Sequence, residues 1–299
     1  MASILIIVVT YNGLRHISSC LSPLKEMPEN MKCLVIDNGS TDGTPELIKK
    51  DYPEVELIEN DKNLGFGAAN NIGIRKAIEG EFDYAYFLNQ DAWIEYEDIL
   101  KLKKIAERNP EYGIISPLQV YAGKRKIDNN FLGKVTKEMI DDFFLSENTP
   151  EKIYCVRGLT IQAAHWLVKI SALKKVGGFS PTFFHYGEDT NLCRRMEFHG
   201  FKLGVVPNIL GVHNRENRKN TSSHYLYLSI NSWRQILSDP NIPFKLTRRL
   251  LEKIIITFLN YPGHFFLALA GFLGHLPSIY RNRKLSIAEK GAFLYDRSE

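Results

Sequence analysis

Apolar runs without polar alternation recur along the first hundred residues, separated by segments with a helical period. The runs are rich in β-branched and aromatic residues and cover positions 3–9, 33–36, 55–58 and 84–88. Runs of this kind are typical of strands that are covered on both faces. Between the first two runs, the spacing i, i+3, i+4, i+7 marks one helical face, formed by Ile17, Cys20, Leu21 and Leu24.

A second helix is predicted between the second and third runs, with Thr44 as its N-cap and Pro45 at its first position. Strand and helix therefore alternate. This order predicts an α/β fold with a doubly wound, mostly parallel sheet flanked by helices. The ligands of such a sheet collect at the carboxyl ends of its strands.

Each of those carboxyl ends is polar and rich in small side chains. The four stretches are residues 10–13, 37–43, 63–67 and 89–91. Any one of them alone is typical of a turn, because Asn, Asp, Gly and Ser are the usual turn formers. Four in succession on one sheet edge favour a ligand site. Neither GxGxxG nor GxxxxGK[ST] occurs, which argues against a dinucleotide fingerprint and a P-loop.

The last of these stretches places a carboxylate directly after a strand pattern. Residues 84–93 read YAYFLNQDAW, so the apolar run leads into Asp91. A carboxylate in a site of low dielectric constant is costly unless it is neutralised, meets a cation or binds a metal. The residues alone leave these three outcomes open.

Length, charge and cysteine content narrow the class of protein. The 299 residues allow one large α/β domain with a smaller appendage, and the net charge is +4. Residues 215–299 carry 13 Lys/Arg against 6 Asp/Glu, so the basic part is the C-terminal region. No nucleic-acid-binding pattern accompanies it, so we expect acidic ligands or an anionic membrane surface instead.

Four scattered cysteines favour a reducing cytoplasm over a disulfide framework or a structural zinc site. They are Cys20, Cys33, Cys155 and Cys193, and they form no CxxC or Cys/His cluster. The apolar run at residues 4–9 is too short for a signal-peptide core and has no basic leader. Secretion is therefore not expected.

Residues 254–280 carry no formal charge, yet they are interrupted by Asn260, Pro262, Gly263 and Pro277. This pattern favours two short helices on a membrane surface, or packed on the catalytic domain, over a transmembrane span. The basic flanks suit anionic lipid; they comprise Arg248, Arg249, Lys253, Arg281, Arg283 and Lys284. A homodimer contact is the alternative. It would also hide Phe265, Phe266, Leu267, Leu269, Phe272 and Leu273.

Five motifs, in order, resemble the inverting GT-A glycosyltransferases of the family 2 group, particularly the bacterial rhamnosyltransferase-like members. They are VVTYNG (8–13), VIDNGSTDGT (35–44), NLGFGAANNIGI (63–74), FLNQDAWI (87–94) and the segment 176–214, which contains GEDTNLCRR and GVHN. The resemblance covers about two-thirds of the chain and implies a GT-A fold with a helical C-terminal appendage.

The resemblance also implies a nucleotide-sugar site at the sheet edge. Its donor-binding residues would be Thr10, Tyr11, Asn12, Asp37, Asn38, Ser40, Asn63, Gly65, Gly67, Asn70, Asn89 and Gln90. Asp37 would accept from the ring N–H of uracil or thymine. Small residues and a helix N-terminus suit a diphosphate.

In the same way, FLNQDAW corresponds to the metal-binding Asp-x-Asp motif of the family. Asp91 would then bind a divalent cation, Mn²⁺ or Mg²⁺, together with His213. Asn89 replaces the first acid of that motif, which removes one formal charge. Without the resemblance, a histidine satisfied by backbone groups is the better interpretation of His213.

Residues 187–190, GEDT, supply the carboxylate that a sugar acceptor needs as general base. The resemblance favours Asp189 as the base and Glu188 as the neighbour that shapes the acceptor site. A helix N-cap is the alternative for this acidic pair. Arg194 and Arg195 would meet the diphosphate, pair with Glu188 or lie on a solvated face.

The predicted organisation is a catalytic domain at residues 1–220, with a donor half (1–116) and an acceptor half (117–220), followed by a helical region at 221–299. The expected enzyme transfers a sugar to a glycan or polyprenyl-linked acceptor in surface polysaccharide synthesis. The first candidate for this sugar is L-rhamnose, with dTDP-rhamnose as the donor. Peripheral contact through residues 240–285 would hold it at the cytoplasmic face of the cell membrane. The alternatives are a UDP-sugar-dependent transferase, a non-catalytic nucleotide-sugar binder, a two-carboxylate hydrolase and a nucleotidyltransferase.

Overall fold

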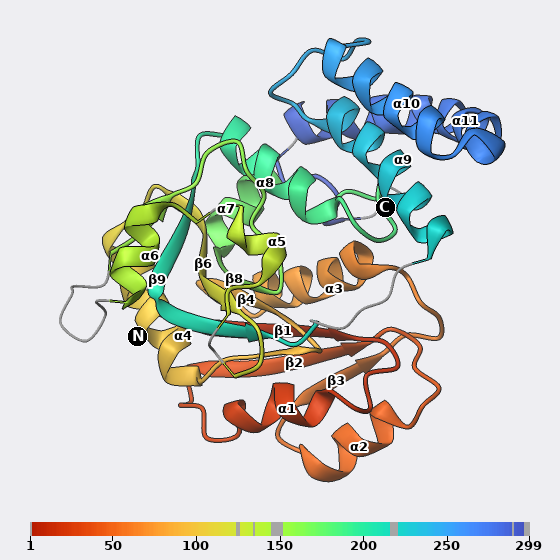
Figure 1. Ribbon diagram of the computed structural model, residues 1–299. Helices are drawn as coiled ribbons and strands as arrows, with labels where there is room; N and C mark the ends of the chain where they lie inside the picture. Colours follow the sequence, from red (N-terminus) through yellow and green to blue (C-terminus); the bar gives the residue numbers. More distant parts are fainter. Residues whose placement is uncertain are drawn as a thin grey trace.

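The computed structural model describes residues 2–123, 126–133, 135–144, 152–215, 221–288 and 290–295. Within them, one mixed sheet runs in the order β3-β2-β1-β4-β8-β6-β9-β5, with β7 beside β9 (Figure 1). The strands are β1 (Ile4–Thr10), β2 (Met31–Asp37), β3 (Glu56–Glu59), β4 (Tyr84–Asn89), β5 (Ala92–Trp93), β6 (Tyr112–Val120), β7 (Tyr154–Cys155), β8 (His165–Lys169) and β9 (Lys202–His213). The helices are α1 (Ile17–Leu21), the 3-10 turn η1 (Ser22–Leu24), α2 (Thr44–Asp51), α3 (Phe66–Glu79), α4 (Tyr96–Arg108), α5 (Asn129–Leu132), α6 (Lys137–Phe144), α7 (Ile170–Val176), α8 (Glu188–Phe198), α9 (Ser222–Ser238), α10 (Arg248–Asn260) and α11 (Pro262–Ala288).

The first half of the sheet is parallel, and its four strands are the four predicted from the apolar runs. β1 pairs in parallel with β2 and β4, and β2 pairs with β3. Successive side chains of β1 enter opposite layers: Ile4 and Ile6 pack with α1 and α4, whereas Leu5 and Ile7 pack with α3. The run is continuously apolar because both faces of the strand are buried.

The second half of the sheet adds antiparallel strands. β8 lies antiparallel to β4 and β6, while β9 runs parallel to β6. β9 is the longest strand of the sheet in the described residues, and its pairing with β6 has a register shift opposite Pro117 and Leu118. β5 pairs with the end of β9, with Ala92 opposite His213, so the chain after β4 meets the chain that ends β9.

The predicted start of α2 is wrong by one residue. The N-cap is Gly43, which has φ 91°, and Thr44 is the first helical residue. The left-handed conformation at this position favours glycine over threonine. The Thr44 hydroxyl donates to Asp42 Oδ1 at 2.5 Å and accepts from the Gly13 backbone N–H at 3.0 Å, which joins the first two loops of the sheet edge.

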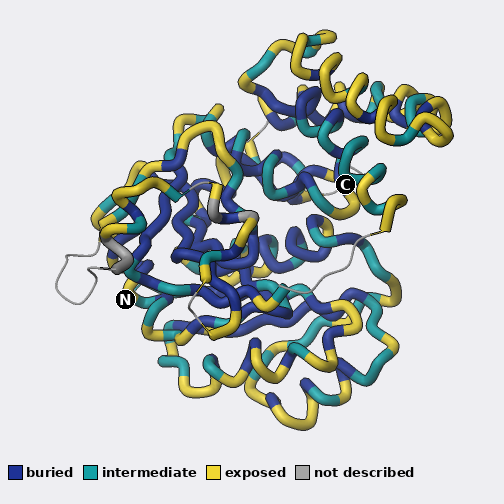
Figure 2. The backbone as a smooth tube through the Cα atoms, in the orientation of Figure 1, coloured by how far each residue is buried: buried dark blue, intermediate teal, exposed yellow. Residues whose placement is uncertain are grey.

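α9, α10 and α11 follow the sheet and form a separate apolar cluster around Trp233, Phe265, Phe272 and Ile279. The chain breaks between α10 and α11, at Tyr261, as predicted, but α11 continues through Pro277, so the predicted interruption there is wrong. Figure 2 shows that much of α10 and α11 is exposed, in contrast to the buried sheet.

Three residues of the predicted outer surface of this region lie inside it. Phe265 and Phe272 pack edge-on against Trp233. Arg283 is buried and donates to the carbonyls of Leu237 and Asp239, so it does not face lipid. These contacts hold α11 against α9 and the first residue after it.

Candidate active site

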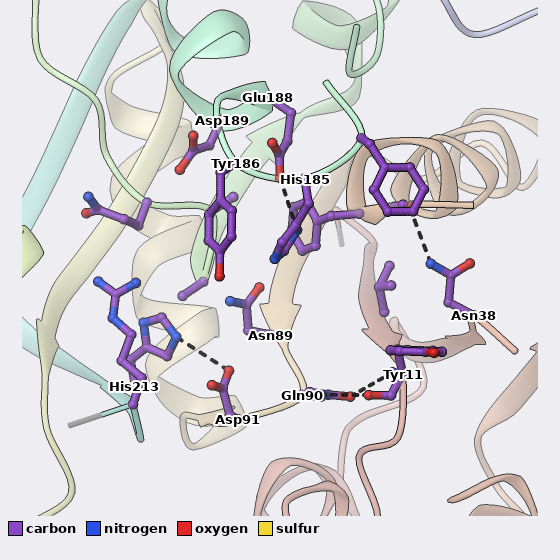
Figure 3. Close-up of a pocket in the computed structure, with 18 of the residues that line it drawn as sticks. Tyr11, Asn38, Asn89, Gln90, Asp91, His185, Tyr186, Glu188, Asp189 and His213 are labelled. Atoms are coloured by element: carbon purple, nitrogen blue, oxygen red, sulfur yellow. Dashed lines mark hydrogen bonds and ion pairs between the residues drawn. The ribbon is translucent and has the colours of Figure 1, made fainter. Parts of the chain in front are cut away.

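A cavity of about 400 Å³ lies at the carboxyl ends of β1 and β4. Among the predicted site residues, its walls include Tyr11, Asn38, Asn63, Gly65, Asn89, Gln90, Asp91, Glu188, Asp189 and His213. Figure 3 shows Asp189, Glu188 and Tyr186 on one side of the cavity and Asp91, Gln90 and Tyr11 on the opposite side. The fold thus brings Asp91, Asp189 and His213 to one space, although they are far apart in the sequence.

The remaining predicted donor residues are not among those that line the cavity; they are Thr10, Asn12, Asp37, Ser40, Gly67 and Asn70. Asn70 Nδ2 donates to the Phe66 carbonyl within α3, at 2.9 Å. Gly67 lies against Phe179, where an added Cβ would clash at 2.9 Å. Both therefore shape the start of α3 in this structure.

Gln90 fixes the loop after β1. Its Oε1 accepts from the Thr10 hydroxyl at 2.7 Å and from the Tyr11 backbone N–H at 2.8 Å. Its Nε2 donates back to the Tyr11 carbonyl at 3.3 Å. The amide of Gln90 thus holds the backbone of Tyr11, a residue of the cavity wall.

Asp37 ends β2 with one carboxylate oxygen engaged and one without a partner among the described residues. Oδ2 accepts from the backbone N–H groups of Gly39, at 3.1 Å, and Ser40, at 2.9 Å. Oδ1 is buried and accepts no hydrogen bond from any residue that the structure describes. Asn12 ties the neighbouring loop to this turn, because its N–H donates to Ser40 Oγ at 2.8 Å. A buried acceptor without a partner is unusual in a folded protein and is typical of a ligand-binding atom.

Asn38 and Asn63 build the wall between β2 and α3. Asn38 Nδ2 donates to Asn63 Oδ1 at 2.9 Å, and Asn63 Oδ1 also accepts from the Gly65 N–H at 2.8 Å. Gly65 has φ 85°, and an added Cβ would clash with the Phe184 carbonyl oxygen. Glycine is required there both by backbone conformation and by this close approach.

Asp91 and His213 face each other at the opposite end of the cavity. Their side chains are 3% and 2% exposed, and Asp91 Oδ1 lies 3.4 Å from His213 Nε2. The backbone sets this pairing, because the Asn214 N–H donates to the Asp91 carbonyl at 2.8 Å beside the β5–β9 pair. Asn89 Oδ1 is buried nearby and has no hydrogen-bond partner in the described chain. Carboxylate and imidazole together form a donor set that suits a divalent cation.

Asp189 and Glu188 occupy the first turn of α8, whose N-cap is Gly187 with φ 112°. Neither carboxylate caps the helix from outside, so the N-cap alternative does not describe them. Burial, followed by repulsion from Asp189, raises the pKa of Glu188 to about 8. The raised pKa favours the protonated form of the Glu188 carboxyl, which can donate a hydrogen bond.

α9 supports the loop that precedes this pair. Asn231 Nδ2 donates to the carbonyls of His185, at 3.0 Å, and Tyr186, at 2.9 Å. Tyr227 Oη also donates to the His185 carbonyl, at 2.8 Å. Tyr186 has φ 63°, a costly conformation for a non-glycine residue, and these bonds help to hold it. α9 therefore contributes to the geometry of the cavity.

Two polar residues of the cavity wall were not predicted from the sequence: Gln162 and Arg215. Arg215 pairs with Asp128, a buried carboxylate that was also not predicted. Arg215 lies two residues after His213, so its proximity to the metal-binding candidate was the one signal available in the sequence. The chain path that brings Gln162 and Asp128 to this edge has no periodic pattern.

The three predicted roles for the arginines of α8 are wrong. Arg194 pairs with Asp239 at 2.8 Å and with Glu197 at 2.6 Å. Arg195 is fully buried, donates to the carbonyls of Val176 and Gly178, and burial lowers its pKa. Both arginines point away from the cavity because α8 packs that side against its neighbours.

Comparison with known proteins assigns the chain to a family. A sequence profile described as "Glycosyl transferase family 2" matches residues 5–163, which is more than half of the chain. The chain is 29% identical over 233 residues to an N-acetylglucosaminyl-diphospho-decaprenol L-rhamnosyltransferase of Mycobacterium tuberculosis, covering 70% of this chain and 75% of that one. It is 28% identical over 220 residues to rhamnosyltransferase WbbL of Escherichia coli strain K12, covering 70% and 82%.

Solved structures show the same fold at lower identity. Residues 1–349 of Staphylococcus aureus TarS superpose with a TM-score of 0.57 at 14% identity, covering 96% of this chain and 81% of that one. The mannosyltransferase PcManGT from Pyrobaculum calidifontis gives 0.54 at 18% identity, covering 96% and 75%. The predicted GT-A fold is confirmed. The chain belongs to glycosyl transferase family 2 and is a glycosyltransferase of the bacterial rhamnosyltransferase-like kind.

Proposed function

We propose that the protein moves a sugar, with inversion, from a nucleoside diphosphate donor to a glycan or lipid-linked glycan in surface polysaccharide synthesis. The observation that carries this proposal is the position of Asp189 across one cavity from Asp91 and His213. dTDP-L-rhamnose is the first candidate for the donor, because two relatives that each match 70% of this chain are named rhamnosyltransferases. A UDP-sugar is the second candidate.

The base and ribose of the donor bind beside Tyr11 and Asp37. The unpartnered Oδ1 of Asp37 accepts the ring N–H that thymine and uracil share. Asn38, Ser40 and Asn63 hold the surrounding loops through the hydrogen bonds described above. The diphosphate then lies near the start of α3, where backbone N–H groups favour an anion.

A divalent cation, Mn²⁺ or Mg²⁺, fits the pair Asp91 and His213. Two ligand atoms bound to one such ion at about 2.1 Å lie no more than about 4.2 Å apart, and Asp91 Oδ1 and His213 Nε2 are 3.4 Å apart. No cluster of three or more His, Cys, Asp or Glu ligands occurs in the described residues, so diphosphate oxygens would complete the coordination. When bound, the cation would neutralise charge that develops on the diphosphate.

Asp189 acts as the general base in this proposal. Its carboxylate accepts the proton of the acceptor hydroxyl while that oxygen attacks the anomeric carbon. The bond from the anomeric carbon to the diphosphate oxygen breaks, and its electron pair leaves with the nucleoside diphosphate. Glu188, whose protonated form is favoured by burial and by the nearby Asp189 carboxylate, donates a hydrogen bond to a sugar hydroxyl beside the reacting centre.

A panel of nucleotide sugars tests the donor assignment. We expect dTDP-L-rhamnose to bind with an affinity at least about 10-fold above those of UDP-glucose and dTDP-glucose in the presence of Mn²⁺, because discrimination of sugar hydroxyls is worth about 1–3 kcal/mol. Calorimetry measures binding, and release of nucleoside diphosphate measures turnover. Chelation by EDTA is the control.

If the protein bound a UDP-sugar more tightly, that sugar nucleotide would replace dTDP-L-rhamnose as the proposed donor. Saturable binding without Mn²⁺-dependent release of diphosphate from any donor would contradict the catalytic proposal.

We further propose that residues 1–220 form the catalytic unit, with its donor half at 1–116 and its acceptor half at 117–220, and that 221–299 attach it to the cytoplasmic face of the cell membrane. No helix in the described part of the chain has both the length and the apolar character to cross a bilayer. A surface contact remains compatible with this finding. The name of the mycobacterial relative describes an acceptor on decaprenyl diphosphate, and a lipid-linked acceptor would be presented at such a surface.

The apolar face of α10 and α11 supports this attachment. Leu251, Ile255 and Leu259 follow one stripe of α10, and the stripe faces solvent. On α11, Phe266 and Leu273 are exposed seven residues apart. The exposed basic residues nearby comprise Arg248, Arg249, Lys253, Arg281 and Lys284. Apolar side chains beside basic ones suit the boundary of an anionic bilayer.

A triple variant, Ile255→Ser/Leu259→Ser/Phe266→Ser, tests the membrane contact. Leu259 and Phe266 are 70% and 73% exposed, so the substitutions leave the cluster around Trp233 intact. Fully burying one large apolar side chain contributes about 1.5–3 kcal/mol, so we expect vesicle binding to fall about 100-fold or more. Flotation with vesicles that contain anionic phospholipid measures the effect.

The matched control is Leu159→Ser/Phe198→Ser, which removes exposed apolar side chains from the catalytic half. It should float like the unmodified protein. Undiminished flotation of the triple variant would contradict the membrane contact. If the triple variant instead lost a concentration-dependent dimer that the unmodified protein forms, this face would be assigned to a homodimer.

A further inference from the structure

Asp128 is a buried carboxylate that touches two residues of the cavity wall without lining the cavity itself. It is 0% exposed. Arg215 Nε and Nη2 donate to its two carboxylate oxygens, each at 2.8 Å. Its Oδ2 also lies 3.5 Å from His213 Nδ1. The Asp128 carboxylate therefore contacts both His213, which faces Asp91, and the guanidinium of Arg215.

The backbone around Asp128 holds it in place. The chain turns back after β6 through a bridge between Val120 and Ile127. The Asp128 N–H then donates to the Gln119 carbonyl at 3.0 Å, and the Asp128 carbonyl accepts from the Phe131 N–H at 2.8 Å. Phe131 is fully buried. The position of the carboxylate is thus set from both sides.

The geometry gives His213 a defined orientation. Its Nδ1 faces Asp128 and its Nε2 faces Asp91, so the ring lies between two carboxylates. A carboxylate beside one nitrogen of a metal-binding histidine fixes the orientation of the ring and directs the other nitrogen toward the metal ion. Burying a carboxylate costs several kcal/mol unless it is well paired, and the forked contact with Arg215 provides that pairing.

We propose that Asp128 is a positioning residue for the metal and diphosphate end of the site. It keeps His213 Nε2 directed toward Asp91 and holds the guanidinium of Arg215 at the cavity wall, where the leaving diphosphate carries negative charge. This inference rests on the proposed function, since it assigns Asp128 a part in binding the metal–diphosphate group. Asp128 itself touches neither substrate nor metal.

The test compares nucleoside diphosphate affinity with Mn²⁺ and with EDTA, using dTDP and UDP as probes in the full-length protein. Removal of such a supporting carboxylate lowers metal affinity about 10–100-fold. In Asp128→Asn we therefore expect the ratio of the two affinities to fall by at least about 10-fold. Titration of Mn²⁺ by electron paramagnetic resonance gives a second readout that does not depend on activity. Asp141→Asn is the matched control, because Asp141 is exposed on α6 in the same segment.

The variant Arg215→Gln separates the two proposed roles of Asp128, which are to orient His213 and to hold the guanidinium of Arg215. It should lower affinity with and without Mn²⁺ alike, because the guanidinium acts on diphosphate charge in both states. If Asp128→Asn does not fold, the double variant Asp128→Asn/Arg215→Gln avoids the unpaired cation. Its affinity ratio should lie at least about 10-fold below that of Arg215→Gln.

If Asp128→Asn left the ratio of nucleotide affinities with Mn²⁺ and with EDTA unchanged, the role of Asp128 would be overturned. The proposed function would still stand. Failure of the double variant to fold would assign Asp128 to stability and would also overturn it. An unmodified protein that binds these nucleotides without any Mn²⁺ dependence would overturn the proposed metal site, and the role of Asp128 with it.

Discussion

Asp189→Asn is expected to lower the turnover number for sugar transfer by about 10²–10⁴-fold, the usual contribution of a positioned general base. The amide has nearly the same shape as the carboxylate but cannot accept the proton of the acceptor hydroxyl. Because Gly187 rather than Asp189 caps α8, the start of the helix should be retained. Donor affinity should therefore change little. Steady-state transfer and calorimetric donor binding, measured on the same preparation, check both parts.

The matched control for this experiment is Asp51→Asn, which alters an exposed aspartate at the end of α2. It should transfer sugar like the unmodified enzyme. Asp189→Asn with normal turnover would remove Asp189 from the role of base. Loss of donor binding in the same proportion as turnover would show that the carboxylate acts in the ground state and not only in the reaction.

Asp91→Asn is expected to lower the turnover number by about 10²–10³-fold, comparable to the loss of one group that stabilises developing charge. Asp91 is the one carboxylate that faces the cavity at this end among the described residues. Asn89 carries no charge and cannot replace it. The dependence of donor binding on Mn²⁺ should weaken together with turnover. Higher Mn²⁺ concentrations should restore part of the activity, because a lost ligand weakens metal affinity.

Asp98→Asn is the control for Asp91, because it removes a carboxylate from the first turn of α4, where Asp98 pairs with Lys101. It should leave the Mn²⁺ dependence unchanged. If Asp91→Asn kept the turnover and the Mn²⁺ dependence of the unmodified enzyme, Asp91 would not be a metal ligand. If EDTA had no effect on the unmodified enzyme, the metal site itself would be contradicted.

The parallel half of the fold was predictable because its signals are local. β1, β2, β3 and β4 are short apolar runs, and α1 repeats at a helical period, so each element is visible within about ten residues of sequence. The polar carboxyl ends of these strands then follow from the topology of parallel sheets. The position of Tyr11, Asn38 and Asp91 at one edge of the sheet was therefore predictable from the sequence.

The antiparallel half was not predictable in the same way. β6 and β8 are fully or almost fully buried, and their partners come from distant parts of the chain, so no alternation of polar and apolar residues marks their pairing. The contact of Asp128 with His213 depends on the turn after β6 and on the end of β9 together. Pairings of this kind arise from tertiary packing and not from local propensity.

From sequence alone came the α/β class, the strands of the donor half and the polar edge that carries Asp37 and Asp91, because strand and helix periods are properties of neighbouring residues. Tertiary structure alone decided that Asp189 stands across a cavity from Asp91 and His213, that Arg195 is buried and that Asp128 supports the histidine. The physical reason is that charge and hydrogen-bond partners act over a few ångströms of space. Only the folded chain brings residues that are far apart in the sequence within that distance.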